Sequence, residues 1–352
     1  MANSTSTTTT TQNRVNVPKC TPIVPSKNRR YFRSYSDMGN HWIKASIEGF
    51  ELVRVPSYKA TCLENTSSNL NGHVLYVDGD RQDLIGKCWL IGEQAVRSGS
   101  ADLMRLVDNY MGKSELYLEY FLGILAHLPQ INPEQHHKII ATCNDTKRHE
   151  PIIRKLAQGT HQVELRGIPT TITIEIVDVL PEGIAALRNH KLKGNVTICD
   201  IGGGNVTITR YANGELASDP IVKDFGCENL LQDLAGNSQL KTIIKQAPKL
   251  DTLNTSLEVG VKKIKGSEDF ALYYGKSVID ILPAYKEELS RFIECRLREV
   301  IKTLDTYKLD GDTILVIGGG SKLPLLSVAL KKKGYVISND GGFDNIKGLG
   351  KE

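Results

Sequence analysis

Short apolar runs rich in β-branched residues alternate along this chain with stretches whose apolar residues recur at helical spacing. The apolar runs predict strands at 31–37, 42–45, 50–58, 74–77, 89–91, 138–143, 163–180, 196–208, 313–317 and 336–338. Helical spacing predicts helices at 101–128 with a break near Gly112, and at 184–187, 226–234, 239–246, 282–304 and 324–330. Residues 250–270 show neither pattern and are predicted to be irregular. The alternation of strands and helices predicts an α/β fold.

One predicted strand pair has a turn with almost no side chains. An apolar run that begins at Val196 ends at Asp200, and the turn then consists of Gly202, Gly203, Gly204 and Asn205. Because glycine lets backbone N–H groups point into a turn and an anion come close, such a turn can hold a phosphate. Asp200 could hold a magnesium ion through the water shell of the ion. The alternative is a tight glycine hairpin with a surface aspartate.

A related turn lies near the N-terminus. A predicted strand ends at Asp37, Gly39 and Asn40 form the turn, and Lys44 on the next strand is expected to point back toward it. The first of these strands is polar, with Ser34 and other hydrophilic residues where a central strand prefers aliphatic ones. Taken alone, this motif is not specific.

Two later junctions add chemistry of the same kind. Glu182 lies between a strand and a helix, where a carboxylate can be held by both elements or can simply stabilise the helix N-terminus. The fully apolar strand 313–317 runs into Gly318, Gly319, Gly320 and Ser321 before a predicted helix. A buried strand, a glycine turn and a helix N-terminus together are a common nucleotide contact.

The composition is that of a soluble globular protein, with 40% hydrophobic and 24% charged residues among 352. No apolar run approaches the roughly 20 residues that span a bilayer, and the first residues lack the apolar core of a secretory signal. The seven cysteines are scattered and form no Cys-x-x-Cys pair, so we expect neither a disulfide framework nor a zinc site. A cytoplasmic location is therefore expected.

The net charge of +4 is unevenly distributed. Residues 1–36 hold six lysines or arginines and no acid, whereas the chain as a whole has 44 basic and 40 acidic residues, so the remainder is slightly acidic. The folded body is therefore not expected to bind nucleic acid directly in a sequence-specific way. Residues 1–30 are rich in threonine and proline and are predicted to be a disordered basic tail with some affinity for membranes, polyanions or an acidic partner.

In their order and separation, these motifs resemble the two phosphate loops, the first connecting segment and the adenosine loop of the actin-fold ATPases. The ending at 343–349 resembles the second connecting segment of that family. Within the superfamily the chain looks most like the bacterial ParM-like plasmid-segregation filament proteins, over roughly residues 31–352. The resemblance implies an actin-like fold, in which two α/β domains flank a nucleotide cleft.

The resemblance also implies roles for the residues that match. Cofactors would be ATP, with GTP as the alternative, and Mg²⁺ bound through water by Asp37 and Asp200. Glu182 and Asp200 would be catalytic, with Glu182 orienting the attacking water. Nucleotide contacts would come from Asp37, Gly39, Asn40, Lys44, Gly202, Gly203, Gly204, Asn205, Gly318, Gly319, Gly320 and Ser321.

The implied domains are domain I at 31–182, to which residues 324–352 return, and domain II at 183–323. The implied function is an ATPase that assembles head to tail into filaments and positions DNA through a DNA-binding adaptor. One alternative is a scaffold filament at the membrane or cell cortex, and another is a small-molecule kinase of the same fold. The chain lacks room for the peptide-binding domain of a chaperone, and no substrate-binding insert of a kinase is evident.

Overall fold

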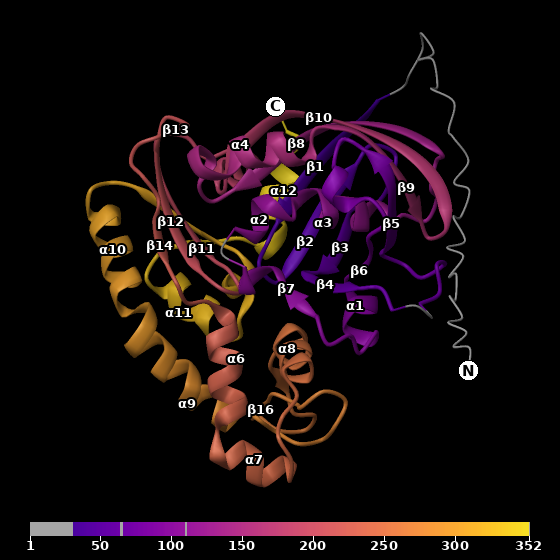
Figure 1. Cartoon of the computed structure of the whole chain (residues 1–352). Helices are drawn as coiled ribbons and strands as arrows, with labels where there is room; N and C mark the ends of the chain where they lie inside the picture. Colours follow the sequence, from indigo (N-terminus) through magenta and orange to yellow (C-terminus); the bar gives the residue numbers. More distant parts are fainter. Residues whose placement is uncertain (1–30, 64–65, 110, 352) are drawn as a thin grey trace, which may run out of the picture. The chain divides into compact units, whose positions relative to one another are not determined.

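The computed structural model describes residues 31–63, 66–109 and 111–351, which belong to one compact unit (Figure 1). Residues 1–30, which the sequence predicts to be a disordered tail, lie outside the described residues. Two large sheets, a two-stranded sheet and the helices packed on them make up the described part of the chain. The predicted α/β class is therefore confirmed.

The first sheet has ten strands, and its centre is parallel while both flanks are antiparallel. Strands β1, β8 and β10 are the parallel neighbours at the centre. In spatial order the strands are β3 (Val53–Pro56), β2 (Trp42–Ile47), β1 (Phe32–Met38), β8 (Glu134–Cys143), β10 (Ile168–Pro181), β9 (Gly159–Leu165), β5 (His73–Gly79), β6 (Cys88–Ile91), β4 (Tyr58–Thr61) and β7 (Met104–Arg105).

The second sheet has six strands and repeats the central arrangement of the first. A hairpin, β11–β12, is followed across the sheet by strands parallel to its first strand, as the hairpin β1–β2 is followed by β8. Its strands are β13 (Glu215–Leu216), β12 (Val206–Ala212), β11 (Asn195–Ile201), β17 (Thr313–Ile317) and β18 (Val336–Ile337), with β14 (Ile221–Lys223) also paired to β12. In both hairpins the first strand carries an aspartate close to its end, Asp37 and Asp200.

The polar residues of β1 are accommodated in the sheet by buried hydrogen bonds. Ser34 and Ser36 are fully buried, and Ser36 contacts the hydroxyl of Tyr117. Ser34 Oγ lies 2.8 Å from His137 Nδ1, and His137 Nε2 lies 2.8 Å from the side-chain oxygen of Gln135. Burial lowers the pKa of His137 to about 3, so its ring is neutral, with Nε2 donating to Gln135 and Nδ1 accepting from Ser34. The polar sequence of this strand is therefore compatible with a central position.

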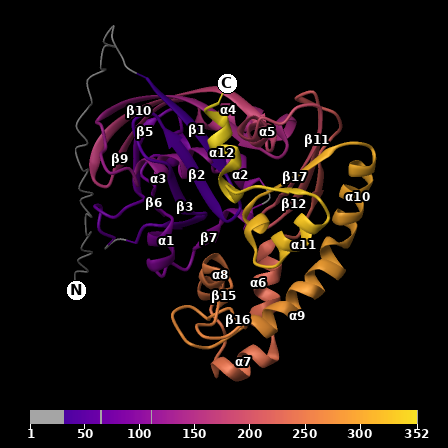
Figure 2. The same cartoon turned by 180° about the vertical axis from the view of Figure 1, so that it is seen from behind.

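Helices cover both faces of the first sheet. Helix α3 is buried along its whole length and packs against β5, β6 and β9 of the antiparallel flank, while α4 packs against α3 and the central strands β8 and β10. On the other face α5 and α12 pack against each other, and Figure 2 shows the two helices side by side. The helical segments in this part of the chain are η1 (Gln82–Leu84), α1 (Glu93–Arg97), η2 (Leu106–Asp108), α2 (Gly112–Glu115), α3 (Tyr117–Leu125), α4 (Thr146–Ala157), α5 (Ile184–His190), η5 (Gly341–Phe343) and α12 (Asp344–Leu349).

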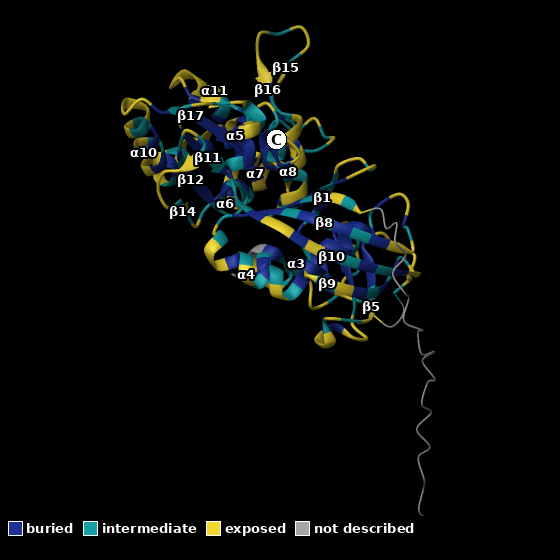
Figure 3. Cartoon of the chain, turned by 90° about the horizontal axis from the view of Figure 1, so that it is seen from above, coloured by how far each residue is buried: buried dark blue, intermediate teal, exposed yellow. Residues whose placement is uncertain are grey.

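Helix α5 also contacts the second sheet, where Leu187 packs with residues of β11 and β17. The other face of that sheet is covered by the amphipathic helix predicted at 282–304, which the structure extends as α9, a π-helical turn and α10. The helical segments here are α6 (Cys227–Gly236), α7 (Ser238–Ile244), α8 (Leu250–Val259), α9 (Leu282–Phe292), η3 (Ile293–Leu297), α10 (Arg298–Leu309), η4 (Gly319–Lys322) and α11 (Leu326–Lys332). Between α8 and α9, the loop joining β15 (Lys262–Lys263) to β16 (Phe270–Ala271) is largely exposed (Figure 3).

Three predictions of secondary structure were wrong. Residues 250–259 form α8, because Leu253 and Leu257 recur at helical spacing and are buried despite the polar residues between them. Residues 104–105 form the edge strand β7 instead of a helix, because they pair with β4. Pro324 precedes α11, which begins at Leu326, and the turn after β17 continues as the 3₁₀ helix η4.

The scattered cysteines predicted no disulfide framework, but the structure contains a disulfide. The sulfur atoms of Cys62 and Cys88 are bonded, although 26 positions separate these residues in the sequence. Cys62 follows β4 and Cys88 begins β6, and the antiparallel pairing of these strands places the two residues opposite each other, with Cys62 N–H donating to the Cys88 carbonyl at 3.0 Å. Sequence spacing carried no sign of this pair because the contact depends on strand pairing.

The described residues form separate apolar cores on the two sheets, while α5 and α12 link them. The division into domain I and domain II stays a prediction. Within residues 324–352, which were predicted to return to domain I, α12 contacts β1 and β2, while β18 pairs with β17 of the second sheet. Among the described residues, no helix is long and apolar enough to cross a membrane.

Candidate functional site

A cavity of about 420 Å³ lies where the turns of the two sheets meet. Most of the site residues predicted from the sequence border it: Asp37, Gly39, Asn40, Lys44, Glu182, Asp200, Gly202, Gly203, Asn205, Gly318 and Gly319. Gly204, Gly320 and Ser321 do not line it. Gly320 and Ser321 are buried behind the wall, where Ser321 Oγ donates to the Gly318 carbonyl at 2.8 Å.

The first turn presents a buried ion pair to the cavity. Asp37 and Lys44 are directly opposite in the β1–β2 register, and Lys44 Nζ lies 2.8 Å from Asp37 Oδ2. Thr142, on the parallel strand β8, directs its hydroxyl toward the other oxygen of Asp37 at 3.5 Å. The cation and the carboxylate are therefore held by strands, which fixes them more firmly than a loop would.

The second turn is fastened to the N-terminus of α6. Gly202 N–H donates to the Asn205 carbonyl at 2.9 Å, which closes the turn. The first amides of α6, from Cys227 and Glu228, donate to the carbonyls of Gly202 and Gly203 at 3.0 and 2.9 Å. These contacts satisfy donors that a helix start otherwise leaves open, and they fix the turn at the edge of the cavity.

Asp200 is the carboxylate of the cavity that lacks a close partner. No side-chain hydrogen bond or ion pair joins Asp200 to the described residues, whereas Asp37 and Glu182 each pair with a lysine. Removal from water, and then the nearby carboxylates of Glu182 and Asp37, raise the pKa of Asp200 to about 7. A partly buried carboxylate in this position is suited to a cation.

The third turn requires glycine where it passes Asp200. Gly318 has a φ of +83°, and a Cβ atom there would lie 2.2 Å from Asp200 Oδ1 and 2.5 Å from the Ile201 carbonyl oxygen. Only a residue without a side chain can take this position without displacing Asp200. The Gly318 N–H donates to the Gly341 carbonyl at 3.3 Å, so residues 341–343 join the same wall of the cavity.

Glu182 forms an ion pair with a residue that the sequence did not single out. Lys113, on α2, has its Nζ 3.0 Å from Glu182 Oε1, and both side chains are about nine-tenths buried. Burial by itself lowers the pKa of Lys113, but the Glu182 carboxylate outweighs it and the pKa is raised, so the lysine is charged. The Glu182 backbone is fixed as well, because its N–H donates to the Cys143 carbonyl at 2.9 Å and Tyr211 donates to its carbonyl at 3.2 Å.

Further cavity residues were also missed by the sequence analysis. Arg54 on β3 stacks on Trp42, with 3.6 Å between the guanidinium carbon and the ring centroid, and lies 5.6 Å from the centroid of Phe343. All three line the cavity. Their positions in the sequence carry no motif, since an arginine within a short polar strand is typical of an exposed edge.

Two ion pairs connect the strands of the first sheet with helices of the second half. Arg105 on β7 forms a bidentate pair with Glu228 on α6, and Arg54 Nη2 lies 3.1 Å from Glu258 Oε1 on α8. Glu228, Glu258 and Arg54 all border the cavity. The two sides of the cavity are therefore joined by charge pairs at its margin.

The donor set of the cavity fits a magnesium ion with a phosphate chain. Magnesium prefers oxygen ligands and keeps several of its waters, and the unpaired Asp200 carboxylate with Asp37 nearby offers such ligands. The cation of Lys44 and the turn at 202–205 offer the complementary contacts for anionic oxygens.

Comparison with known proteins gives the same fold. Residues 36–184 match the family model described as the N-terminal domain of actin-like proteins. No curated protein sequence matches the chain. Among solved structures, that of Bacillus thuringiensis ParM with ATP has a TM-score of 0.66 at 16% identity, covering 91% of this chain and 97% of that chain.

Two further structures agree. Actin-like protein Alp7A matches with a TM-score of 0.63 at 15% identity, over 91% of this chain and 95% of that chain. The Alp12 filament structure matches with a TM-score of 0.60 at 17% identity, over 91% of this chain and 97% of that chain. The resemblance found in the sequence motifs is thus confirmed at the level of the fold. The chain therefore has the actin-like fold, and its residues 36–184 are similar to the N-terminal domain of actin-like proteins.

Proposed function

We propose that this chain binds ATP together with Mg²⁺ in the cavity and hydrolyses the nucleotide. The observation that carries the proposal is that the turns after β1, β11 and β17 border one cavity with Asp37, Glu182 and Asp200. Phosphoryl transfer depends mainly on positioning and on neutralising charge, and this set of groups can provide both. The neighbouring ParM structure that contains ATP supports the same choice of ligand.

Each turn contacts a different part of the nucleotide. Gly39, Asn40 and Lys44 contact one part of the phosphate chain, and the turn at 202–205 contacts the other. The nucleoside lies against Gly318 and Gly319, while Gly320 and Ser321 hold that turn in shape. Asp37 and Asp200 would hold Mg²⁺, and the ion would neutralise negative charge on the phosphate oxygens.

Glu182 orients the water that attacks the terminal phosphate. Its ion pair with Lys113 and the two backbone hydrogen bonds restrict the carboxylate to one orientation. A positioned group of this kind typically contributes about 10²- to 10⁴-fold to a rate. Lys113 acts here as a positioning residue, since its contact is to Glu182.

The same proposal includes assembly. ATP binding closes the cleft and permits head-to-tail contact between copies of the chain, and hydrolysis weakens that contact. Head-to-tail contacts that do not close into a ring generate helical polymers. The neighbouring Alp12 structure is of a filament, which supports this choice. In the cell, the filament would position DNA through a separate DNA-binding adaptor.

The first test measures nucleotide binding with one variant and one control. Asp200→Asn keeps the size of the side chain and removes its charge, so calorimetry is expected to show Mg²⁺-dependent ATP binding weakened at least about 10-fold, the loss of one charged contact of about 1.4 kcal/mol. Asp219→Asn is the control, because this side chain is 91% exposed and lies outside the cavity. Equal Mg-ATP affinity in Asp200→Asn and the wild type would contradict the assignment of the second turn.

High-speed pelleting with ATP, GTP, ADP and no nucleotide, followed by electron microscopy, tests assembly and the choice of nucleotide. Deletion of residues 1–30 is expected to leave ATP-dependent pelleting intact. It is expected to reduce association with anionic lipid or DNA at low salt, because the basic residues of the tail are removed. If deletion abolishes pelleting itself, the tail is part of the polymer contact and is not a tether.

A further inference from the structure

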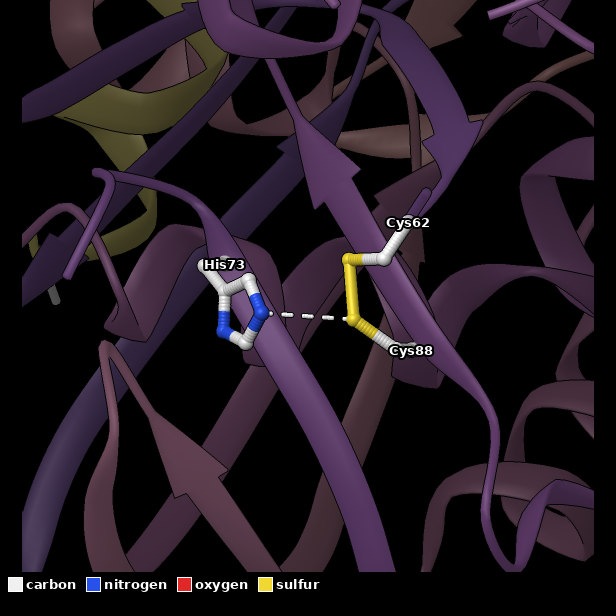
Figure 4. A group of neighbouring side chains, drawn as sticks. All are labelled: Cys62, His73 and Cys88. Atoms are coloured by element: carbon white, nitrogen blue, oxygen red, sulfur yellow. Dashed lines mark hydrogen bonds between the residues drawn. A yellow bond between two sulfur atoms is a disulfide. The ribbon is translucent and has the colours of Figure 1, made fainter. Parts of the chain in front are cut away.

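Cys62, Cys88 and His73 form a compact group on the antiparallel flank of the first sheet (Figure 4). Cys62 and Cys88 face each other across the pairing of β4 with β6. His73 pairs with Leu90, which is two residues from Cys88 on the same strand, so His73 and Cys88 lie on the same face of the sheet. Strand pairing thus brings together three side chains that are 11 and 15 positions apart in the sequence.

The three side chains offer ligand atoms that converge. One sulfur from each cysteine and one ring nitrogen of His73 all lie within 4.8 Å of one another. Zinc binds sulfur at about 2.3 Å and imidazole nitrogen at about 2.0–2.1 Å. The distance between two ligand atoms of one ion therefore cannot exceed the sum of two such bond lengths. The histidine is 4% exposed and both cysteines are partly exposed, which leaves a path for an ion from solvent.

The side chain of His73 makes little polar contact apart from Cys88. Its Nε2 is directed at Cys88 Sγ, 3.2 Å away, and its Nδ1 has no hydrogen-bond partner among the described residues. A disulfide by itself needs no imidazole beside it, and burying a polar ring without full hydrogen bonding is unfavourable. Sulfur is only a weak hydrogen-bond acceptor, and an ion bound to Nε2 would replace this weak contact with a ligand bond.

We propose that Cys62, Cys88 and His73 form a redox-gated site for a thiophilic divalent cation, of which Zn²⁺ is the representative. The structure shows the oxidised state, in which the sulfurs are bonded to each other and are unavailable as thiolates. A thiol or phosphine reductant supplies two electrons, the S–S bond breaks, and two protons give the two thiols. On binding, each thiol releases its proton to solvent, and the two thiolates with His73 Nε2 hold the ion, with water in the remaining position.

The site is separate from the proposed nucleotide site, since none of its three residues lines the cavity. It is therefore expected to bind its ion in the presence or absence of nucleotide. A later two-electron oxidation by a disulfide or peroxide would restore the S–S bond and expel the ion.

The experiment uses the full chain and Co²⁺ as a spectroscopic substitute for Zn²⁺. The metal-free protein is reduced with a phosphine, which avoids a competing thiol, or is left oxidised. The reduced protein is expected to bind one Co²⁺ with a thiolate-to-cobalt charge-transfer band and the visible bands of tetrahedral coordination. The oxidised protein is expected to show neither. Calorimetry with Zn²⁺ then measures the affinity of the reduced chain.

Variants identify the ligands. Cys62→Ser and His73→Ala are each expected to weaken Zn²⁺ binding more than about 100-fold, since loss of an outer partner alone costs 10–100-fold. Cys295→Ser is the matched control, because Cys295 is an exposed free cysteine outside the group, and its affinity is expected to equal that of the wild type. The proposal is overturned if the reduced wild type shows no charge-transfer band, or if Cys62→Ser retains it. The wild-type comparison needs no variant and so does not depend on how the variants fold.

Discussion

Lys113 Nζ lies 3.0 Å from Glu182 Oε1 in the wall of the cavity, and it joins a short helix to the end of the longest strand. Both side chains are almost buried, so the pair restricts the position of the carboxylate. In the proposed function this contact decides where Glu182 can hold a water molecule. If the proposal holds, the ion pair couples the position of α2 to the rate of hydrolysis.

Glu182→Gln tests that link. The amide keeps the shape of the side chain but cannot hold the water as a carboxylate does, so phosphate release is expected to slow about 10²-fold or more. Binding of Mg-ATP is expected to change little, because Glu182 is not proposed to hold the metal ion. Steady-state phosphate release and calorimetry measure the two quantities, and polymer is expected to persist longer in the variant.

A second buried pair gives the control. Glu119 on α3 forms an ion pair with Lys59 on β4, both side chains are largely buried, and neither residue lines the cavity. Glu119→Gln is expected to lower thermal stability as much as Glu182→Gln does, with turnover unchanged. Should the two variants lose stability equally and both keep wild-type turnover, Glu182 is a structural residue that stabilises the start of α5.

The raised pKa of Asp200 predicts a pH dependence of metal binding. The carboxylate is largely protonated at pH 6 and ionised at pH 8, because its pKa is about 7. Mg²⁺ competes with the proton, so the apparent affinity for Mg²⁺ in the presence of ATP is expected to fall about 10-fold from pH 8 to pH 6. The same titration in Asp200→Asn measures the pH dependence that comes from the nucleotide, and a curve identical to the wild type would contradict the prediction.

The same pKa has a consequence for stability without ligand. The folded state holds a proton on Asp200 up to about pH 7, whereas the unfolded chain loses it near 3.8, so this group lowers stability as pH rises between these values. Asp200→Asn removes the charged form, and its melting temperature relative to the wild type is expected to be higher at pH 8 than at pH 5. Differential scanning calorimetry of the nucleotide-free proteins measures this difference.

The sequence predicted those parts of the site that depend on neighbouring residues. Asp37 and Lys44 follow from a single hairpin, and Gly318 follows from an apolar strand that ends in glycine. Lys113 could not be found in this way, because its partner lies 69 positions away and a lysine on a short helix carries no motif. Arg54 was missed for the same reason, since its position over Trp42 depends on the pairing of β2 with β3.

The errors in the fold have a related cause. Helix α8 has a mixed polar sequence, and its few leucines are recognisable as a buried face only when the core beneath them is known. The strand β7 has two residues, too few for any periodicity, and it exists because β4 lies beside it. Local pattern was sufficient for long elements such as α9 and α10, where the apolar spacing continues over several turns.

Gly318→Ala tests the third turn. The new methyl group would meet Asp200 Oδ1 at 2.2 Å, so either the turn or the carboxylate must move. Both lie at the proposed nucleotide site, and we expect ATP affinity to fall at least about 10-fold, in addition to a loss of stability of about 1 kcal/mol from the positive φ. Calorimetry and thermal unfolding measure the two effects.

Gly311→Ala is a control that separates the effect of a steric clash from the effect of backbone conformation. Gly311 also has a positive φ, of +98°, but a Cβ atom there would meet nothing within 4 Å. This control is expected to lose a similar amount of stability from backbone strain and to bind ATP like the wild type. If Gly311→Ala weakens ATP binding as much as Gly318→Ala does, the effect reflects general destabilisation and gives no support to a nucleotide contact at Gly318.

We expect the ion pair between Arg105 and Glu228 to slow the release of nucleotide. It joins β7 to α6 at the margin of the cavity, and both side chains are mostly buried, so solvent screens it less than a surface pair. In Arg105→Met the cleft is expected to open more readily, and a fluorescent ADP analogue is expected to dissociate about 10-fold faster, as for a loss of about 1.4 kcal/mol. Arg81→Met is the control, since Arg81 pairs with Asp83 within the first half of the chain and away from the cavity. An unchanged release rate in Arg105→Met would show that the pair does not hold the two sides of the cleft together.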